Sequence, residues 1–86
     1  MKYQIPEALI RFLRIIKLSK KETKQGKNVT YKELSVILGT DDKPAGFIAT
    51  EGSFEYEEVY NAVSNHEKTH WFFDTFEAAH SFVYGV

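Results

Sequence analysis

The sequence predicts a small α+β domain with the element order of a winged helix: helix, helix, short helix, β-hairpin and C-terminal helix. Apolar residues recur at helical spacing near the N-terminus, a T-Y-K-E run begins at Thr30, and the aromatic run 70–73 is typical of a strand. A three-stranded antiparallel meander with flanking helices is the alternative. A chain of 86 residues is expected to form one domain, 1–86, around one core.

The first expected element is a helix over residues 6–20. Pro6 suits a first helical turn, and the basic residues that follow lie opposite an apolar face. That face comprises Leu9, Ile10, Phe12, Leu13 and Ile16. The stretch 20–27 has no apolar residue and is expected to be a frayed helix end followed by a loop.

A second helix is expected to begin at Thr30. The threonine hydroxyl would accept from the amide three residues on, Glu33 would reach back, and Gly39 would end the helix. A third, short helix is expected over 45–50 after the Asp41-Asp42 pair. A strand over 46–50 competes with it, because the segment is too short for periodicity to decide.

Residues 51–53 are expected to form a turn before a hairpin. We predict that 54–63 is its first arm, although a helix fits the same spacing. The aromatic run 70–73 would be the second arm, after the polar break 64–68, because a lone strand cannot satisfy its backbone donors and acceptors.

A last helix is expected after this hairpin. Asp74 or Thr75 is a suitable N-cap, and Gly85 suits the end. The residues that share its predicted face are Phe76, Ala79, His80 and Val83.

The composition excludes several classes of protein. There is no cysteine, which excludes disulfides, thiolate zinc sites and a cysteine nucleophile, and makes a cytoplasmic location the default expectation. Arg11, Arg14 and Lys17 interrupt the one segment that resembles a signal peptide, and no apolar run is long enough to span a membrane.

The charges are unevenly distributed along the chain. Residues 1–43 carry ten Lys or Arg and five acids, a balance of +5, whereas residues 44–86 carry one Lys and seven acids, a balance of −6. The leading hypothesis is a non-enzymatic regulatory protein that contacts nucleic acid through its basic half, because neutralising phosphates drives such binding. The candidate residues are Arg11, Arg14, Lys17, Lys21, Lys24, Lys27, Tyr31, Lys32 and Lys43.

The segment G-K-N-V-T-Y-K-E-L-S, residues 26–35, resembles the run that leads into the second helix of the helix-turn-helix in the DNA alkyltransferase and alkyltransferase-like family. The K-P-A-G run at 43–46 falls where that family has R-A-V-G. The resemblance implies a helix-turn-helix scaffold with Tyr31 and Lys43 near nucleic acid. The family's P-C-H-R run has no counterpart here, so alkyl transfer to a cysteine is excluded.

The acidic half supports a different hypothesis, a protein-interaction or inhibitor module of the antidefence type. Aromatic residues would anchor a basic partner and carboxylates would pair with it. The candidate residues are Glu55, Tyr56, Glu57, Glu58, Tyr60 and Trp71.

The run from His66 to His70 matches the zinc pattern H-E-x-x-H. That pattern holds zinc only on a helix, whereas Ser64 and Asn65 are turn formers and the aromatic residues that follow favour extended backbone. We therefore expect a polar hairpin turn whose histidines face water. A weak surface metal site at His66 and His70 is the third hypothesis, and neither a cofactor nor catalysis is expected.

Overall fold

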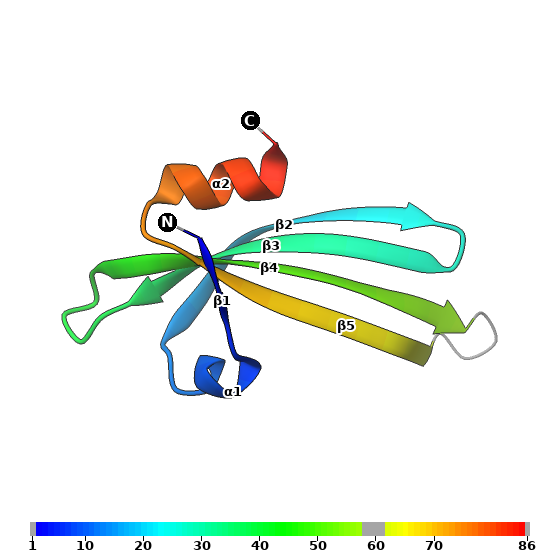
Figure 1. The fold of residues 1–86 in the computed structure, drawn as a ribbon, viewed down its shortest axis with the longest axis horizontal. Helices are drawn as coiled ribbons and strands as arrows, with labels where there is room; N and C mark the ends of the chain where they lie inside the picture. Colours follow the sequence, from blue (N-terminus) through cyan, green and yellow to red (C-terminus); the bar gives the residue numbers. More distant parts are fainter. Residues whose placement is uncertain (1, 58–61, 86) are drawn as a thin grey trace.

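The computed structural model describes residues 2–57 and 62–85 and shows an antiparallel sheet of five strands with a helix on each side (Figure 1). The spatial order is β1-β5-β4-β3-β2, so the four long strands form a meander. The elements in chain order are β1 (Tyr3–Ile5), α1 (Glu7–Ile10), β2 (Ile15–Gln25), β3 (Asn28–Leu38), β4 (Pro44–Glu57), β5 (Ala62–Phe73) and α2 (Phe76–Tyr84).

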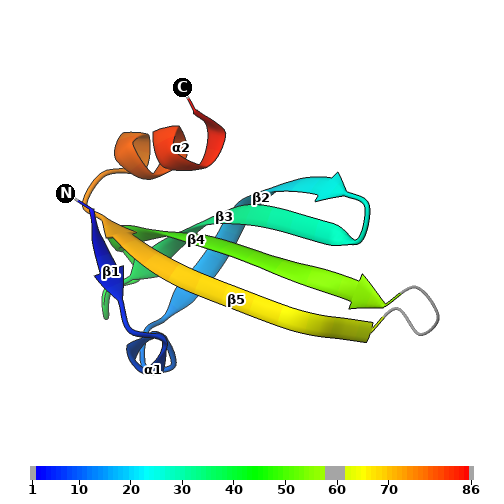
Figure 2. The ribbon, with the colours of Figure 1, turned by 45° about the vertical axis from the view of Figure 1, so that its right-hand side comes forward.

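The chain crosses the sheet between its first two strands. β1 pairs with β5 at one edge, and β2 lies at the other edge beside β3. The segment through α1 makes this crossing on the face opposite α2, as the two views of the ribbon show (Figure 2). The amide of Leu38 donates to the carbonyl of Arg14 over 2.9 Å, which ties the end of the crossing to β3.

The core lies between α2 and the middle of the sheet. Ala79 and Val83 of α2 pack with a buried cluster of three sheet residues, Leu34, Ala49 and Phe73. We call the side of the sheet that carries these three residues the α2 face. Directly paired residues of antiparallel strands point to the same side of the sheet, and successive residues of a strand point to opposite sides. The registers therefore show which face each paired residue of the long strands points to.

The expectation for the last helix is confirmed. The Thr75 hydroxyl accepts from the amide of Ala78 at 3.2 Å, and Gly85 ends the helix in the left-handed conformation with φ 73°. Here the local signals and the packing agree, because the face that carries Ala79 and Val83 is the face that the core buries.

The winged-helix prediction is wrong, because the described chain is mostly an antiparallel sheet with two short helices. The three-stranded alternative is also wrong, since the sheet has five strands. Of the helix expected over 6–20, only Glu7–Ile10 is helical, and the basic stretch 20–27 runs through β2 into a turn at Gly26, whose φ is 62°. Pairing with β3 outweighs the local helical spacing.

The second expected helix is instead β3, and the T-Y-K-E run forms no capping box. Thr30 lies in the ladder opposite Thr23 and Ser53. Val29 and Tyr31 are buried on the face opposite α2, whereas Leu34 and Val36 point to the α2 face. The segment is rich in β-branched and aromatic residues, which suit a strand that is covered on both sides.

The expectations for the central region are partly wrong. The prediction of a short helix over 45–50 is wrong, and the competing prediction of a strand over 46–50 is confirmed, because these residues lie within β4. The turn expected at 51–53 is also wrong, since those residues continue the same strand. A hairpin does form from β4 and β5, but residues 64–68 belong to β5 and are not its turn. Part of the expected first arm, 58–61, lies outside the described residues.

Candidate functional site

The long open edge of the sheet is β2. It contains 11 residues, which corresponds to about 36 Å of extended chain. At the other edge β1 has 3 residues and covers only residues 70–72 of β5, so the preceding part of β5 forms a second, shorter open edge among the described residues. Within the described part of the chain β2 pairs with β3 alone, so its outer row of backbone N–H and C=O groups faces away from the sheet. Such an edge is a template for pairing with another extended segment.

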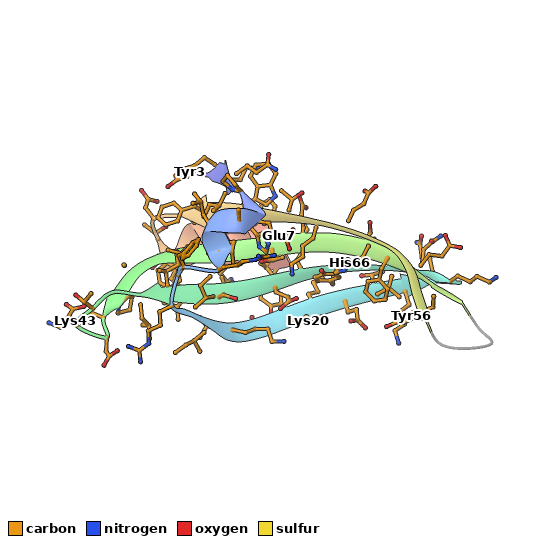
Figure 3. The ribbon with its side chains drawn as sticks, turned by 90° about the horizontal axis from the view of Figure 1, so that it is seen from below. Tyr3, Glu7, Lys20, Lys43, Tyr56 and His66 are labelled. Atoms are coloured by element: carbon orange, nitrogen blue, oxygen red, sulfur yellow. The ribbon has the colours of Figure 1, made fainter. Side chains whose placement is uncertain are left out.

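Lysine side chains line β2 on both faces. By the register, Lys17, Lys20 and Lys24 point to the face opposite α2, and Lys21 points to the α2 face. Lys20 is labelled in Figure 3, where the molecule is seen from the side opposite α2. Lys20 Nζ lies 3.3 Å from a Glu22 carboxylate oxygen and 5.1 Å from the centre of the Tyr31 ring. Lys17 Nζ lies 3.7 Å from a Glu33 carboxylate oxygen. The edge therefore carries a positive charge that Glu22 and Glu33 only partly offset.

Exposed apolar residues lie directly before and within the first half of this strand. Phe12 is 84% exposed, Leu9 is 54% exposed and Leu13 is partly exposed; we call these three residues the apolar tip. Ile16 and Leu18 of β2 are about half exposed. The sequence did not predict this surface, because Leu9, Phe12, Leu13 and Ile16 have the spacing of a buried helical face. An exposed cluster of large apolar side chains beside basic ones is typical of an interaction surface.

The residues proposed for nucleic-acid binding do not form one patch. Arg14 pairs with Asp42 at the β3–β4 turn, and Lys43 lies at that same end of the sheet (Figure 3). Lys27 lies in the β2–β3 turn at the other end. Tyr31 is only 7% exposed and cannot offer its ring to a base. The other predicted cations are Arg11 after α1, Lys17, Lys21 and Lys24 on β2, and Lys32 on β3.

The helix-turn-helix that the resemblance implied is wrong. Residues 26–35 form the β2–β3 turn and most of β3, so they contain no recognition helix and no helix before one. The K-P-A-G run at 43–46 begins β4.

The acidic and aromatic residues proposed for a protein interaction are also dispersed. Trp71 is half buried beside α2, and its Nε1 donates to a Glu51 carboxylate oxygen over 2.8 Å. Tyr56 packs edge-on against Phe54, with ring centres 4.7 Å apart, and lies toward the far end of the sheet (Figure 3). Glu55 is exposed on β4, and Glu57 is the last residue of that strand. Glu58 and Tyr60 lie outside the described residues.

The two histidines of the H-E-x-x-H run lie within β5 and not in a turn. Four residues of strand separate their Cα atoms by about 13 Å, so they cannot meet one ion as they would on a helix. The Tyr31 hydroxyl lies 2.7 Å from His66 Nε2, and Thr50 Oγ1 lies 3.0 Å from His70 Nδ1. No group of three potential metal ligands occurs in the described ranges, and His70 is buried and does not face water.

Two groups beneath α1 have shifted pKa values. Burial raises the pKa of Tyr31, and the charges of Glu33 and Glu7 raise it further. Burial lowers the pKa of His70, and the charge of Lys68 lowers it further, while Glu7 and Glu33 oppose that shift. Both side chains are therefore neutral at neutral pH. The contacts of Tyr31 with His66 and of His70 with Thr50 connect β3, β4 and β5.

None of the helices in the described part of the chain is both long and apolar enough to cross a membrane. We define the basic edge as β2 with its four lysines, Lys17, Lys20, Lys21 and Lys24. The clearest candidate for a functional site is this basic edge together with the apolar tip before it. Comparison with known proteins adds nothing to this assignment, because no family model, curated protein or solved structure matches the chain.

Proposed function

We propose that the protein is a non-enzymatic binding module whose basic edge captures an acidic, extended segment of a partner protein. The observation that carries this proposal is the 11-residue open strand, which is lined by lysines and preceded by exposed apolar residues. An added strand would hydrogen-bond to the outer backbone groups of β2, and its side chains would lie beside the lysines on both faces.

The lysines select the partner. Lysine on an edge strand opposes pairing between two copies of the same edge, because the ammonium groups would face one another. The carboxylates of an acidic strand would instead be attracted to these ammonium groups. The lysines therefore disfavour self-association and favour an acidic segment, which is how specificity arises from combined attraction and repulsion.

The apolar tip would supply the anchor. Exposed charges on an edge contribute little affinity on their own, whereas a buried aromatic side chain at the centre of an interface contributes much more. Phe12 is the most exposed large apolar side chain among the described residues, and Leu9 and Leu13 lie close to it in sequence. We expect an apolar residue of the partner, next to its acidic strand, to cover Phe12.

Nucleic acid fits this surface less well. A phosphate backbone would also be attracted to the lysines, but Glu22 lies among them and Glu33 lies beside Lys17. A nucleic acid makes no use of open backbone groups on a strand, and Tyr31 is not accessible for stacking on a base.

The first experiment measures the binding of a short synthetic peptide in which glutamate alternates with valine, blocked at both ends. We expect saturable binding with amide NMR shifts along β2. Adjacent amides of an extended peptide point to opposite edges, so N-methylation of two adjacent central amides blocks backbone pairing along both edges of the peptide. This modified peptide keeps its charge, and it should bind at least about tenfold more weakly if backbone pairing matters.

Two double variants separate the edge from general electrostatics. Lys20→Gln with Lys24→Gln removes charge from the edge, whereas Lys27→Gln with Lys43→Gln removes the same charge from the two turns. We expect only the first pair to weaken the peptide. Equal effects of both pairs, equal binding of the methylated peptide, or tighter binding of a short DNA duplex would each contradict the proposal.

A further inference from the structure

A hollow of about 430 Å³ lies on the α2 face beside Val83, near the end of α2. It is separate from the backbone edge of β2, because side chains from β2, β3, β4 and β5 line it. Most of its lining residues are polar or charged, the exceptions being Gly52, Val83 and the aromatic Tyr31, and all of them lie within the described ranges.

The wall formed by β2 and β3 is basic. Lys21 lies directly opposite Lys32 in the register, and Thr23 lies opposite Thr30 two residues further along. Two like charges directly opposite one another on a sheet are destabilising. The two lysines belong to none of the ion pairs found within the described residues. An anionic group bound between them would relieve the repulsion, and the two threonine hydroxyls could donate to it.

The side chains that β4 and β5 direct toward the hollow are acidic or carry hydroxyl groups. Lys68 also lines the hollow, but it is paired with Gly52 and its side chain points to the face opposite α2. Glu51 lies opposite Thr69, and Ser53 lies opposite Glu67. The hollow is thus positive on one side and negative on the other, with two hydroxyl residues beside each pair of charges. A ligand that fits both walls carries an anionic and a cationic group at opposite ends.

The two central charges are held apart. Lys32 and Glu51 are direct partners across β3 and β4, where an ion pair would be expected. Instead, Lys32 Nζ donates to the Phe82 carbonyl at 3.3 Å and lies 4.6 Å from the centre of the Phe82 ring. Glu51 accepts from Trp71 Nε1. Both contacts direct these side chains toward neighbours other than one another, which leaves the charge separation across the hollow intact.

We propose that this hollow binds a small zwitterion, with its anionic group at Lys21 and Lys32 and its ammonium group near Glu51 and Glu67. Lys21 and Glu67 lie on strands three spacings apart, about 14 Å between their backbones, so the ligand must be extended. A short peptide with free termini has this chemistry and this length: three residues span about 10 Å, and the side chains of the walls reach inward. The proposal does not rest on strand capture at the β2 edge, although Lys21 belongs to both surfaces.

The test is an NMR titration with tri-alanine and its two blocked forms. N-acetylation removes the ammonium charge, and C-terminal amidation removes the carboxylate charge, without changing the rest of the peptide. We expect tri-alanine to shift the amides of β2, β3, β4 and β5 that line the hollow. We expect each blocked form to bind about tenfold more weakly, since a charge-assisted contact contributes that much.

Variants assign the two ends. Lys21→Gln should weaken the binding of tri-alanine and leave the already weak binding of the amidated peptide unchanged. Glu67→Gln should also weaken the binding of tri-alanine, but it should leave the already weak binding of the acetylated peptide unchanged. Lys24→Gln is the matched control, because it lies on the same strand but points to the opposite face. The proposal is overturned if tri-alanine does not bind saturably, if either blocked form binds as well as the free peptide, or if Lys24→Gln has the effect expected of Lys21→Gln.

Discussion

The hydroxyl of Tyr31 and Nε2 of His66 lie 2.7 Å apart and join β3 to β5 across the intervening strand β4. The Tyr31 ring makes this connection by lying over Gly52, the residue opposite it on β4. A glycine is required there, because a Cβ at position 52 would lie 2.5 Å from the Tyr31 hydroxyl oxygen. This contact helps to fix the register of β3, β4 and β5 on the face opposite α2.

Gly52→Ala should destabilise the protein. The added methyl group must displace a buried ring, and overpacking of this kind costs about 1–3 kcal/mol of unfolding free energy. Urea denaturation of the variant measures this loss. Ser53→Ala is the control, since its side chain points to the other face, and an equal loss there would show that the close approach of Tyr31 is not the cause.

Tyr31→Phe should change the response of stability to alkaline pH. The folded protein holds the Tyr31 proton above the ordinary pKa of 10.0, so the unfolded chain releases that proton first. The stabilisation is complete below pH 10.0 and is lost as the pH rises through the raised pKa. The free energy of unfolding should therefore fall less steeply above pH 10.0 in the Phe variant. Parallel curves for the two proteins would contradict this account.

His70 should make the protein less stable in mild acid. Its pKa is lowered in the folded state from 6.5, so the unfolded chain takes up the proton first as the pH falls. The stabilisation is present above pH 6.5 and decreases as the pH falls toward the folded pKa. His70→Gln, which cannot titrate, should lose this dependence; a variant with the wild-type slope between neutral pH and the folded pKa would be evidence against it.

Thr75→Ala should destabilise α2 by about 1 kcal/mol, because the Ala78 amide loses its acceptor. Thr75→Ser keeps the hydroxyl and should recover most of that stability. Thermal unfolding of the two variants provides the comparison. If Ser and Ala are equally destabilising, the cap does not contribute through its hydroxyl.

The last helix could be predicted because all its signals are local. Thr75, the apolar spacing and Gly85 lie within a few residues of one another and agree with the packing. In β3 the local signals conflict. Thr30 and Glu33 match a capping box, but Val29 and Tyr31 alternate as they would on a strand, and pairing with two neighbouring strands decides the outcome.

The sequence indicated that Lys17, Lys21, Lys24 and Lys32 are candidate binding residues, but their arrangement could not be predicted, because it depends on the register of the strands. Nothing in the sequence indicates that Lys21 lies opposite Lys32, or that Glu51 faces the same hollow, until the strands are paired. The apolar tip was hidden for a related reason. Leu9, Phe12 and Leu13 have the spacing of a buried helical face, but the helix ends at Ile10 and leaves Phe12 exposed.

The most direct test of strand capture at the basic edge is the set of nuclear Overhauser contacts between the acidic probe peptide and the protein. Strand addition predicts backbone contacts between the peptide and β2, together with slower amide exchange at alternate β2 residues. Contacts confined to lysine side chains, without any change in the exchange of β2 amides, would show that the edge attracts acidic chains only by charge and would contradict the proposed function.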